Sequence, residues 1–492
     1  MSEQSSAPPA FQATPEEIAT VVRVLGQAHL LADRDPRLIE LQRATSGMFK
    51  SLKKGRRVAA REAVAAADRS VTALTATAAP DRIDDETRGN HLRSSAGGEV
   101  AGVLLRSRPC YICKQHYTQV DAFYHQLCPE CAAFSHGKRD ARTDLTGRRA
   151  LLTGGRAKIG MYIALRLLRD GAHTTITTRF PKDAARRFAS LPDAADWLGR
   201  LDIVGIDLRD PAQVIALADS VAAAGPLDII INNAAQTVRR SPGAYAPLVA
   251  AEDEPLPAEI EDAVAGLRTF ARAHDAHPVA LEGSVHEHPV LAGHVLAARN
   301  PLLALRHDSA SPARIADGTA VDAGGLVPDL AHVNSWTQGV GEVDPLELLE
   351  VQLCNVTAPF LLVSRLRPSL AASPARRKYV VNVSAMEGQF SRRYKGPGHP
   401  HTNMAKAALN MMTRTSAAEM FATDSILMTA VDTGWITDER PHHTKVRLAE
   451  EGFHAPLDLV DGAARVYDPI VMGESGTDLY GCFLKDYRPS PW

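Results

Sequence analysis

Four cysteines stand in two closely spaced pairs in the first third of the chain. Each pair is a Cys-x-x-Cys, and fourteen residues separate the two pairs. Two such pairs put four thiolates on tight turns, where they can close a tetrahedron around one ion. Sulfur at all four positions leaves no open coordination position, so the ion would brace the structure and take no part in chemistry. The spacing predicts structural zinc, with a rubredoxin-like iron site and redox or unrelated buried thiols as alternatives, at Cys110, Cys113, Cys128 and Cys131.

A glycine turn at residues 148–160, RRALLTGGRAKIG, predicts a phosphate site. A short apolar run leads into Thr153-Gly154-Gly155, and the residues from Lys158 onward are apolar at helical spacing. This is a strand, a tight turn and a helix N-terminus, where unpaired N–H groups and the helix dipole favour an anion. Glycines also serve ordinary turns, so the stretch gains weight only from the strands and helices that come after it in the chain.

Strands and helices alternate after this turn. We expect strands near residues 150–153, 174–178, 202–206 and 227–231, with helices near 159–169, 182–198 and 212–223 between them. Such an order requires parallel pairing with right-handed crossovers. It predicts an α/β fold with a doubly wound parallel sheet, whose ligand lies at the carboxyl ends of the strands.

The length and net charge of the chain limit its domain organisation and its partners. With 492 residues the chain needs more than one domain, and a net charge of −2 gives no overall bias toward nucleic acid or membrane. We expect a helical region over residues 1–105, with helices at 16–31, 36–49 and 59–75, then a zinc-ribbon-like module at 106–140 and the α/β domain at 145–492. The basic stretch 50–57 is interpreted as a solvated helix face, so nucleic acid is not the expected partner. The first residues do not have the pattern of a signal peptide, and clustered cysteines suit a reducing compartment, so we expect a cytoplasmic protein.

From about residue 145 onward the chain resembles the short-chain dehydrogenase/reductases. The segment TGGRAKIG matches that family's TGxxxGxG turn, and NNAA at 232–235 matches its NNAG. Further matches are Asp207-Leu208, Asn355, the strand at 380–385, the helix at 406–412 and the segment at 431–436. The resemblance implies a Rossmann-type fold, a small-molecule substrate, a homodimer or homotetramer, and a pyridine dinucleotide bound by Gly154, Arg156, Lys158, Ile159, Gly160, Arg179, Asp207, Leu208, Asn232, Ala234, Lys406 and Gly434.

The residues around the second strand favour NADP over NAD. An acidic residue at the end of that strand would hold the ribose 2′-OH of NAD. This chain has Thr177-Thr178-Arg179 there, with Arg156 and Lys158 in the glycine turn. Three cations and no carboxylate suit a 2′-phosphate. Lys158 replaces the family's middle glycine, which is a departure.

The catalytic tetrad of the family is incomplete. Asn355 and Lys406 match, but Thr402 stands where the family has tyrosine, and Ala385 stands where it has serine. An aliphatic hydroxyl titrates far above the ~10 of a phenol, so Thr402 can orient a substrate but cannot readily exchange a proton. The long segment 387–401 offers other donor candidates, namely Glu387, Tyr394, Lys395, His399 and His401. Among them, Tyr394 could deliver a phenol from a loop, and His401 precedes Thr402.

Three interpretations of this loss stay open. The chain is an NADP-linked oxidoreductase with a non-standard proton donor, a non-redox enzyme that binds a nucleotide, or a sensor or assembly scaffold without catalysis. A large insertion at about 240–343, with expected helices at 259–274 and 291–306, is either a lid or partner-binding subdomain or a solvated decoration. Its histidines fit no tight metal pattern. The last residues, 488–492, are expected to reach a neighbouring subunit.

Overall fold

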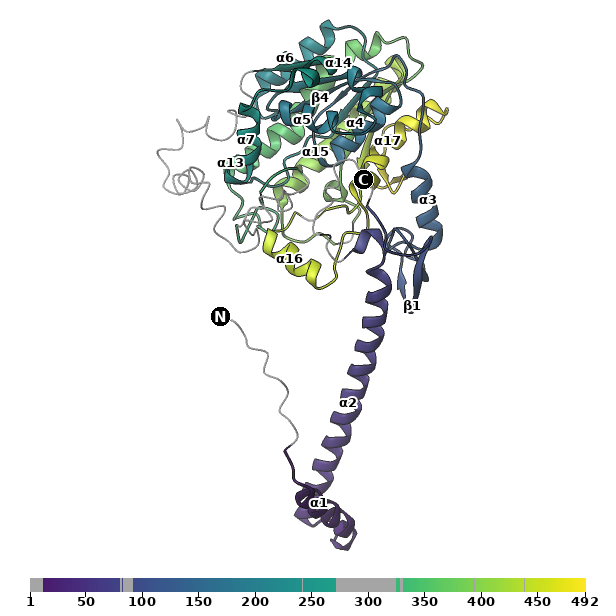
Figure 1. Cartoon of the computed structure of the whole chain (residues 1–492), viewed down its shortest axis with the longest axis vertical. Coiled ribbons are helices and arrows are strands. Elements are labelled where there is room, and N and C mark those ends of the chain that lie inside the picture. The colour runs from purple at the N-terminus through teal and green to yellow at the C-terminus, as the bar shows by residue number, and fades with distance from the viewer. Residues whose placement is uncertain are drawn as a thin grey trace, which may run out of the picture. The chain divides into compact units, whose positions relative to one another are not determined.

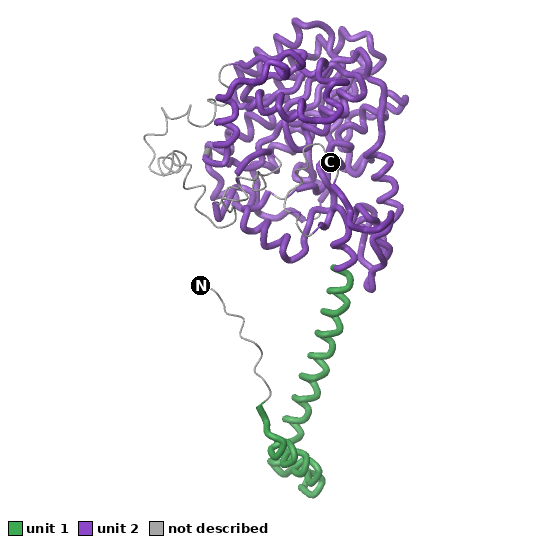
Figure 2. Tube along the Cα trace, in the orientation of Figure 1, with its two compact units in different colours: residues 1–69 green, residues 70–492 purple. Residues whose placement is uncertain are grey.

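The computed structural model describes residues 12–79, 82, 92–240, 242–270, 324–327, 331–392, 394–437 and 439–492. The chain divides into two compact units, residues 1–69 and 70–492 (Figure 2). The second predicted helix of the insertion, at 291–306, and the insertion's histidines at 274–307 lie outside the described residues.

The first unit is helical. Helix α1 (Pro15–Gln27) begins with a capping box, in which the Thr14 hydroxyl accepts from the Glu17 N–H and the Glu17 carboxylate accepts from the Thr14 N–H. Helix α2 (Pro36–Thr72) is one continuous helix of 37 residues. The prediction of two separate helices here was wrong, because the only breaker between them is Gly55. A glycine inside a helix costs about 1 kcal/mol relative to alanine, which is too little to end a long helix.

The second unit is built on a nine-stranded sheet with the order β11-β10-β9-β8-β6-β3-β4-β5-β7. All neighbouring strands are parallel except β10 and β11. The predicted doubly wound parallel sheet is confirmed. Its strands are β3 (Arg149–Leu152), β4 (His173–Thr178), β5 (Leu201–Gly205), β6 (Ile229–Asn232), β7 (Gly266–Thr269), β8 (Lys378–Ser384), β9 (Ile426–Asp432), β10 (Phe483–Lys485) and β11 (Arg488–Ser490).

Helices cover both faces of this sheet (Figure 1). Every residue of β8 and β9 is buried, as expected for central strands enclosed on both sides. One face is covered by α4 (Lys158–Arg169), α5 (Pro181–Ala189) and α17 (Leu459–Glu474), and the other by α6 (Pro211–Ala223), α14 (Ala358–Ala371) and α15 (Pro400–Asp424). Shorter helices are α7 (Ala246–Asp253), α8 (Ala258–Ala263), α13 (Pro345–Gln352) and α16 (His442–Glu450).

Two edges of the sheet differ from expectation. The insertion was expected to be helical over 259–274, but α8 ends at Ala263 and the chain then forms β7, parallel to β5. At the other edge, β11 folds back on β10 of its own chain, and the Ser391 N–H donates to the carbonyl of Trp492. The expected contact of the last residues with a neighbouring subunit stays a prediction.

Residues Pro345–Ala371 form the one helical stretch in the described part of the chain that is long and apolar enough to cross a membrane by length and composition. Leu362, Leu366 and Leu370 of this stretch are buried in the core behind the sheet. Their burial is that of a core helix.

The cysteine module precedes the sheet. It consists of the antiparallel pair β1 (Val100–Pro109) and β2 (His116–Asp121), followed by α3 (Pro129–Arg139). The hairpin begins at Val100, before the predicted module boundary at residue 106. Leu104, Tyr117 and Leu127 of this region belong to the same apolar core as α4 and α17. The module is thus packed onto the α/β domain.

Candidate functional site

A cleft of about 700 Å³ opens at the carboxyl ends of the strands. This is where ligands bind in open α/β sheets. Eleven of the twelve predicted dinucleotide-binding residues line it: Gly154, Arg156, Lys158, Ile159, Gly160, Arg179, Asp207, Leu208, Ala234, Lys406 and Gly434. The twelfth, Asn232, is buried beneath the cleft, where its Nδ2 donates to Asn382 Oδ1 at 2.8 Å.

The glycine turn has the shape of a phosphate cradle. A Cβ on Gly160 would lie 1.9 Å from the Gly154 carbonyl oxygen, so no side chain fits where the turn meets α4. The N-cap residue of α4, Ala157, supplies no side-chain acceptor to the first N–H groups of the helix. A helix N-terminus with uncapped donors at the wall of a cleft suits an anionic ligand. The turn therefore fits the pyrophosphate of a dinucleotide.

Lys158, which stands where the family motif has its middle glycine, has a left-handed backbone conformation. Its φ is 53°, in the left-handed region that side chains rarely adopt. Holding such a residue there costs on the order of 1 kcal/mol, and strain of this kind concentrates at functional sites. The departure from the family motif changes the side chain and leaves the turn intact.

Arg179 stands at the end of β4 among aromatic rings. Its guanidinium lies 4.8 Å from the ring centre of Tyr245 and 5.7 Å from that of Phe180, and the two rings stack at 6.0 Å. Tyr245 belongs to the insertion, as do Gly324 and Leu326, which also line the cleft. The described part of the insertion therefore contributes to the cleft wall and is no mere surface decoration.

Arg156, one of the other two predicted cations, already has partners. Arg156 forms an ion pair with Asp183 at 2.5 Å and donates to the carbonyl of Gly324 at 2.7 Å. Similarly, the Asp207 carboxylate accepts from Arg209, at 2.5 Å for the shortest contact. Arg156 is thus held by Asp183 and Gly324, whereas Arg179 contacts aromatic rings.

Lys406 is a buried residue of the cleft wall. Its Nζ donates to the carbonyl of Val383 at 2.9 Å. Burial lowers the pKa of Lys406 to about 8, and the nearby Glu387 opposes this shift. A Cβ on Gly388 would lie 2.5 Å from the carbonyl carbon of Lys406, so this glycine lets the loop after β8 approach α15.

Two hydroxyl groups of the tetrad pattern are missing from the cleft. Ala385 lines the cleft without a hydroxyl, and the hydroxyl of Ser384 donates to Asn410 Oδ1 at 2.6 Å.

Asn355 lies in a π-helical turn at Leu353–Thr357. Its amide is paired on both sides with the main chain of Gln236, at 2.8 and 2.9 Å, so it does not present a free amide to the cleft.

Of the predicted donor candidates, Glu387 and His399 line the cleft, but Tyr394 and His401 do not, and neither does Thr402. Tyr394 is 73% exposed. Thr402 and His401 are buried at the start of α15 with the Thr402 hydroxyl 3.5 Å from His401 Nε2, and neither lines the cleft. Burial also lowers the pKa of His401, which favours its neutral form.

Asp432 lines the cleft within the matched segment 431–436, but the sequence match assigned no role to it. It ends β9, is 4% exposed, and pairs in register with Ser384 of β8. Burial raises the pKa of the Asp432 carboxyl, while the Gly434 N–H that it accepts at 3.1 Å lowers this pKa in part. An acid at the carboxyl end of an otherwise apolar strand was the available signal.

The four predicted metal ligands do come together. Their sulfur atoms all lie within 4.8 Å of one another, and this is the one group in the described part of the chain that could hold a metal ion. The Cys128 N–H donates to Cys110 Sγ at 3.3 Å, and Lys114, after the first pair, has the positive φ of a tight knuckle. Four converging thiolates fit a tetrahedral ion such as zinc.

The nearby histidines are not ligands in this arrangement. His125 is buried and its Nδ1 lies 2.8 Å from the Thr77 hydroxyl, while His136 pairs with Asp121 at 3.2 Å. Burial lowers the pKa of His125 well below its usual value. His125 is thus part of the polar core beside the module.

Comparisons with known proteins place residues 148–247 in a family model described as short chain dehydrogenase. A relative from Acanthamoeba polyphaga mimivirus, uncharacterized protein R665, is 30% identical over 375 residues, 74% of this chain and 71% of that protein. A probable oxidoreductase from Streptomyces antibioticus is 43% identical over 91 residues, 18% of this chain and only 30% of its own length.

Solved structures with some similarity to the chain were also found. The RhlG/NADP active-site complex of Pseudomonas aeruginosa has 18% identity, covers 69% of this chain and 95% of its own, and gives a TM-score of 0.42. A short chain dehydrogenase from Burkholderia cenocepacia J2315 in complex with NADP has 19% identity, covers 70% and 97%, and gives 0.41.

Proposed function

Because the chain belongs to the short-chain dehydrogenase/reductase family, we propose that it is an NADP-dependent oxidoreductase acting on a carbonyl or alcohol group of a small molecule. The observation that carries the proposal is that one cleft joins the glycine turn, Arg179 and the buried Lys406. When bound, the dinucleotide would supply or accept the hydride. The remaining chemistry falls to the side chains of the cleft.

Arg179 supports the phosphorylated nucleotide. It directly follows β4, where a carboxylate would favour NAD, and its planar guanidinium can hold a phosphate in two parallel hydrogen bonds. Tyr245 and Phe180 border this guanidinium and would restrict its movement. Arg179 would therefore bind the 2′-phosphate.

Asp432 is the proposed proton source in place of the missing tyrosine. Its raised pKa favours a neutral carboxyl, which can donate a proton to the carbonyl oxygen of a substrate as the hydride reaches the carbon. The charged groups that face it are Lys485 at 4.0 Å, Asp486 and Glu387. Lys406, with a pKa of about 8, would orient the ribose and add positive charge at the reacting end.

The test is whether the chain oxidises NADPH in the presence of each of a panel of carbonyl compounds. The loss of NADPH is monitored by its absorbance in a stopped-flow instrument. We expect turnover by the wild type and a loss of 10²-fold or more, roughly the contribution of general acid catalysis, in Asp432→Asn. Asp478→Asn is the matched control, because Asp478 pairs with Arg377 away from the cleft. Unchanged turnover in Asp432→Asn would remove Asp432 from the mechanism.

The incomplete catalytic tetrad favours a second candidate function. With Ala385 in place of serine and Thr402 away from the cleft, the chain would serve as a nucleotide-binding sensor or assembly scaffold, or as a non-redox enzyme. Tight NADPH binding without turnover on any carbonyl would support this alternative. Lys406→Ala should then weaken nucleotide binding without any activity to lose.

Self-association and location complete the proposal. Phe360 of α14 and Met411 of α15 are more than half exposed, at 58% and 55%, on a pair of helices that cover the sheet. These apolar side chains support a homo-oligomer, which sedimentation of the purified chain would test.

A cytoplasmic location is proposed because the thiolates of the cysteine module, which we also call the metal module, need a reducing compartment.

A further inference from the structure

The metal module touches the wall of the cleft through Tyr111. Tyr111 lies between the first two metal ligands, Cys110 and Cys113. Its phenolic oxygen accepts a hydrogen bond from the main-chain N–H of Trp435 at 3.0 Å. The two partners are far apart in sequence, and this bond joins a metal knuckle directly to the loop that comes after β9.

Trp435 follows the proposed proton donor Asp432 by three residues, and we call this part of the cleft its reacting end. It lines the cleft together with Gly434 and Ile436. The carbonyl of Trp435 accepts from the Leu457 N–H at 3.3 Å, and its ring packs against Phe453 with 5.1 Å between centres. The main chain at this point is therefore held on both sides, and the knuckle holds the N–H side.

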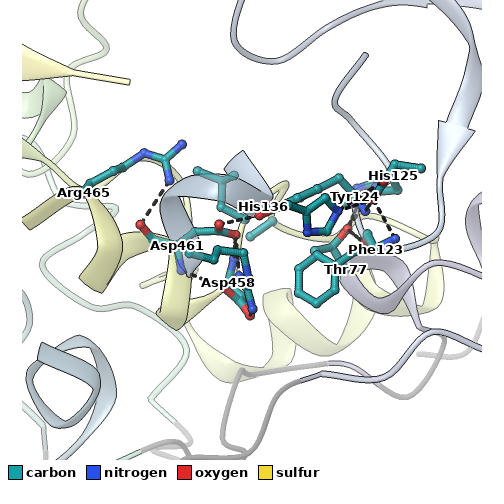
Figure 3. Close-up of polar contacts among 12 residues, drawn as sticks. Thr77, Phe123, Tyr124, His125, His136, Asp458, Asp461 and Arg465 are labelled. Atoms are coloured by element: carbon teal, nitrogen blue, oxygen red, sulfur yellow. Dashed lines mark hydrogen bonds and ion pairs between the residues drawn. The ribbon is translucent and has the colours of Figure 1, made fainter. Parts of the chain in front are cut away.

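A buried polar network fixes the rest of the module to α17 (Figure 3). Tyr124 donates to Asp461 Oδ1 at 2.6 Å, and Arg139 donates to both oxygens of Asp458, at 2.6 and 3.0 Å. Figure 3 shows Asp458 and Asp461 on one side of this cluster and Tyr124 and His125 on the other. These bonds locate β2 and α3, but Tyr111 stands on the first knuckle, whose shape depends on the ion.

We propose that Tyr111 is a positioning residue through which the ion at the four cysteines holds the Trp435 main chain and so shapes the reacting end of the cleft. With the ion bound, the knuckle is rigid and presents the phenolic oxygen to the Trp435 N–H. Without the ion, the knuckle loses the metal–sulfur bonds that order it, and the loop after β9 loses one of its two anchors. The module is then part of the cleft's architecture and more than a stabilising appendage.

Hydrogen exchange of the Trp435 amide measures this bond directly and needs no nucleotide. We compare the zinc-loaded chain, the chain after chelation, Tyr111→Phe, and Tyr117→Phe as the matched control. Tyr117 belongs to the same module, but its hydroxyl donates to the His125 carbonyl at 2.9 Å and does not reach the cleft. Exchange in the peptide that spans 432–437 should be about five- to tenfold faster after chelation and in Tyr111→Phe, as for the loss of one hydrogen bond, and unchanged in Tyr117→Phe.

Two results would overturn the proposal. One is equal exchange in the wild type and Tyr111→Phe, with zinc content of both confirmed by metal analysis. The other is exchange that rises to the same extent in peptides of β3 and β8, because that would mean general loosening and no local coupling.

Nucleotide affinity gives the second readout and rests on the proposed function. Tyr111→Phe should bind NADPH several-fold more weakly than the wild type, and Tyr117→Phe should bind it equally well. If the wild type binds no NADPH, the proposed function fails while the exchange result stands by itself. If the wild type binds and Tyr111→Phe binds as tightly, the positioning role is refuted.

Discussion

Lys406 directs its Nζ at the carbonyl of Val383, 2.9 Å away, from a buried position in the cleft. The neighbouring Ser384 hydroxyl is engaged by Asn410, and no carboxylate forms an ion pair with this ammonium among the described residues. When a lysine ammonium is buried with only a carbonyl as its partner, that one hydrogen bond does not make up for the lost hydration free energy. It is a group that the fold keeps at a cost to stability.

Replacing Lys406 by methionine should therefore stabilise the chain while abolishing nucleotide-dependent activity. Burial lowers the pKa of Lys406 from 10.5 to about 8, so the folded state binds fewer protons than the unfolded state between these values. The cost is fully present below pH 8 and is relieved as the pH rises toward 10.5. We expect a gain on the order of 1–3 kcal/mol at pH 7 that shrinks by about pH 9.5, measured by thermal melts. Lys53→Met, at an exposed lysine, should change little.

Arg179→Asp should reverse the nucleotide preference. The substitution replaces the guanidinium at the end of β4 by a carboxylate, which repels a 2′-phosphate and can accept from a ribose 2′-OH. Titration calorimetry with NADPH and NADH should show a change in their affinity ratio of 10²-fold or more. Arg156→Gln is the control with the smaller expected effect, because Asp183 already neutralises Arg156. If Arg179→Asp leaves the ratio as it was, Arg179 does not select the cofactor.

Gly160→Ala should damage the phosphate cradle. The new Cβ would lie 1.9 Å from the Gly154 oxygen, so the turn or the start of α4 must shift. We expect nucleotide binding to fall at least tenfold and the melting temperature to drop. Gly137→Ala in α3 meets nothing within 4 Å and should raise stability by up to about 1 kcal/mol. Equal nucleotide affinity in Gly160→Ala and the wild type would contradict the assignment of this turn.

Metal analysis of the purified chain should find about one zinc ion per chain. Cys110→Ser removes one of four ligands and should reduce both the zinc content and the melting temperature, because a structural zinc contributes directly to folding. Cys482→Ser, a cysteine outside the cluster, should keep the full content. Retained zinc after Cys110→Ser would refute the four-cysteine site.

The sequence was most informative where a local pattern has one structural meaning. The alternation of apolar strands and helices predicted the parallel sheet, and the cysteine spacing predicted a cluster whose four sulfurs meet. The left-handed Lys158 shows why a motif can lose a glycine and keep its turn: the backbone conformation matters, and a lysine can adopt it at some cost.

The proposed proton donor, Asp432, could not be predicted in the same way. Tyr394 and His401 have suitable chemistry, but loop and helix geometry place one in solvent and the other in the interior. Asp432 was overlooked because its importance depends on burial and on the neighbouring strands β8 and β10, which are brought together only by the fold. Likewise, a run of four residues such as β7 carries too little periodicity to be recognised before its partner strand is known.

Strand β7 has a practical consequence for anyone who wishes to trim this protein. The 240–343 segment resembles a removable loop in a sequence comparison, yet its residues Gly266–Thr269 pair with β5 along one border of the sheet. Excising the whole segment would bare the hydrogen-bonding groups of β5, and an uncovered strand of that kind invites aggregation. A shortened version should retain the stretch through β7 if it is to stay monodisperse.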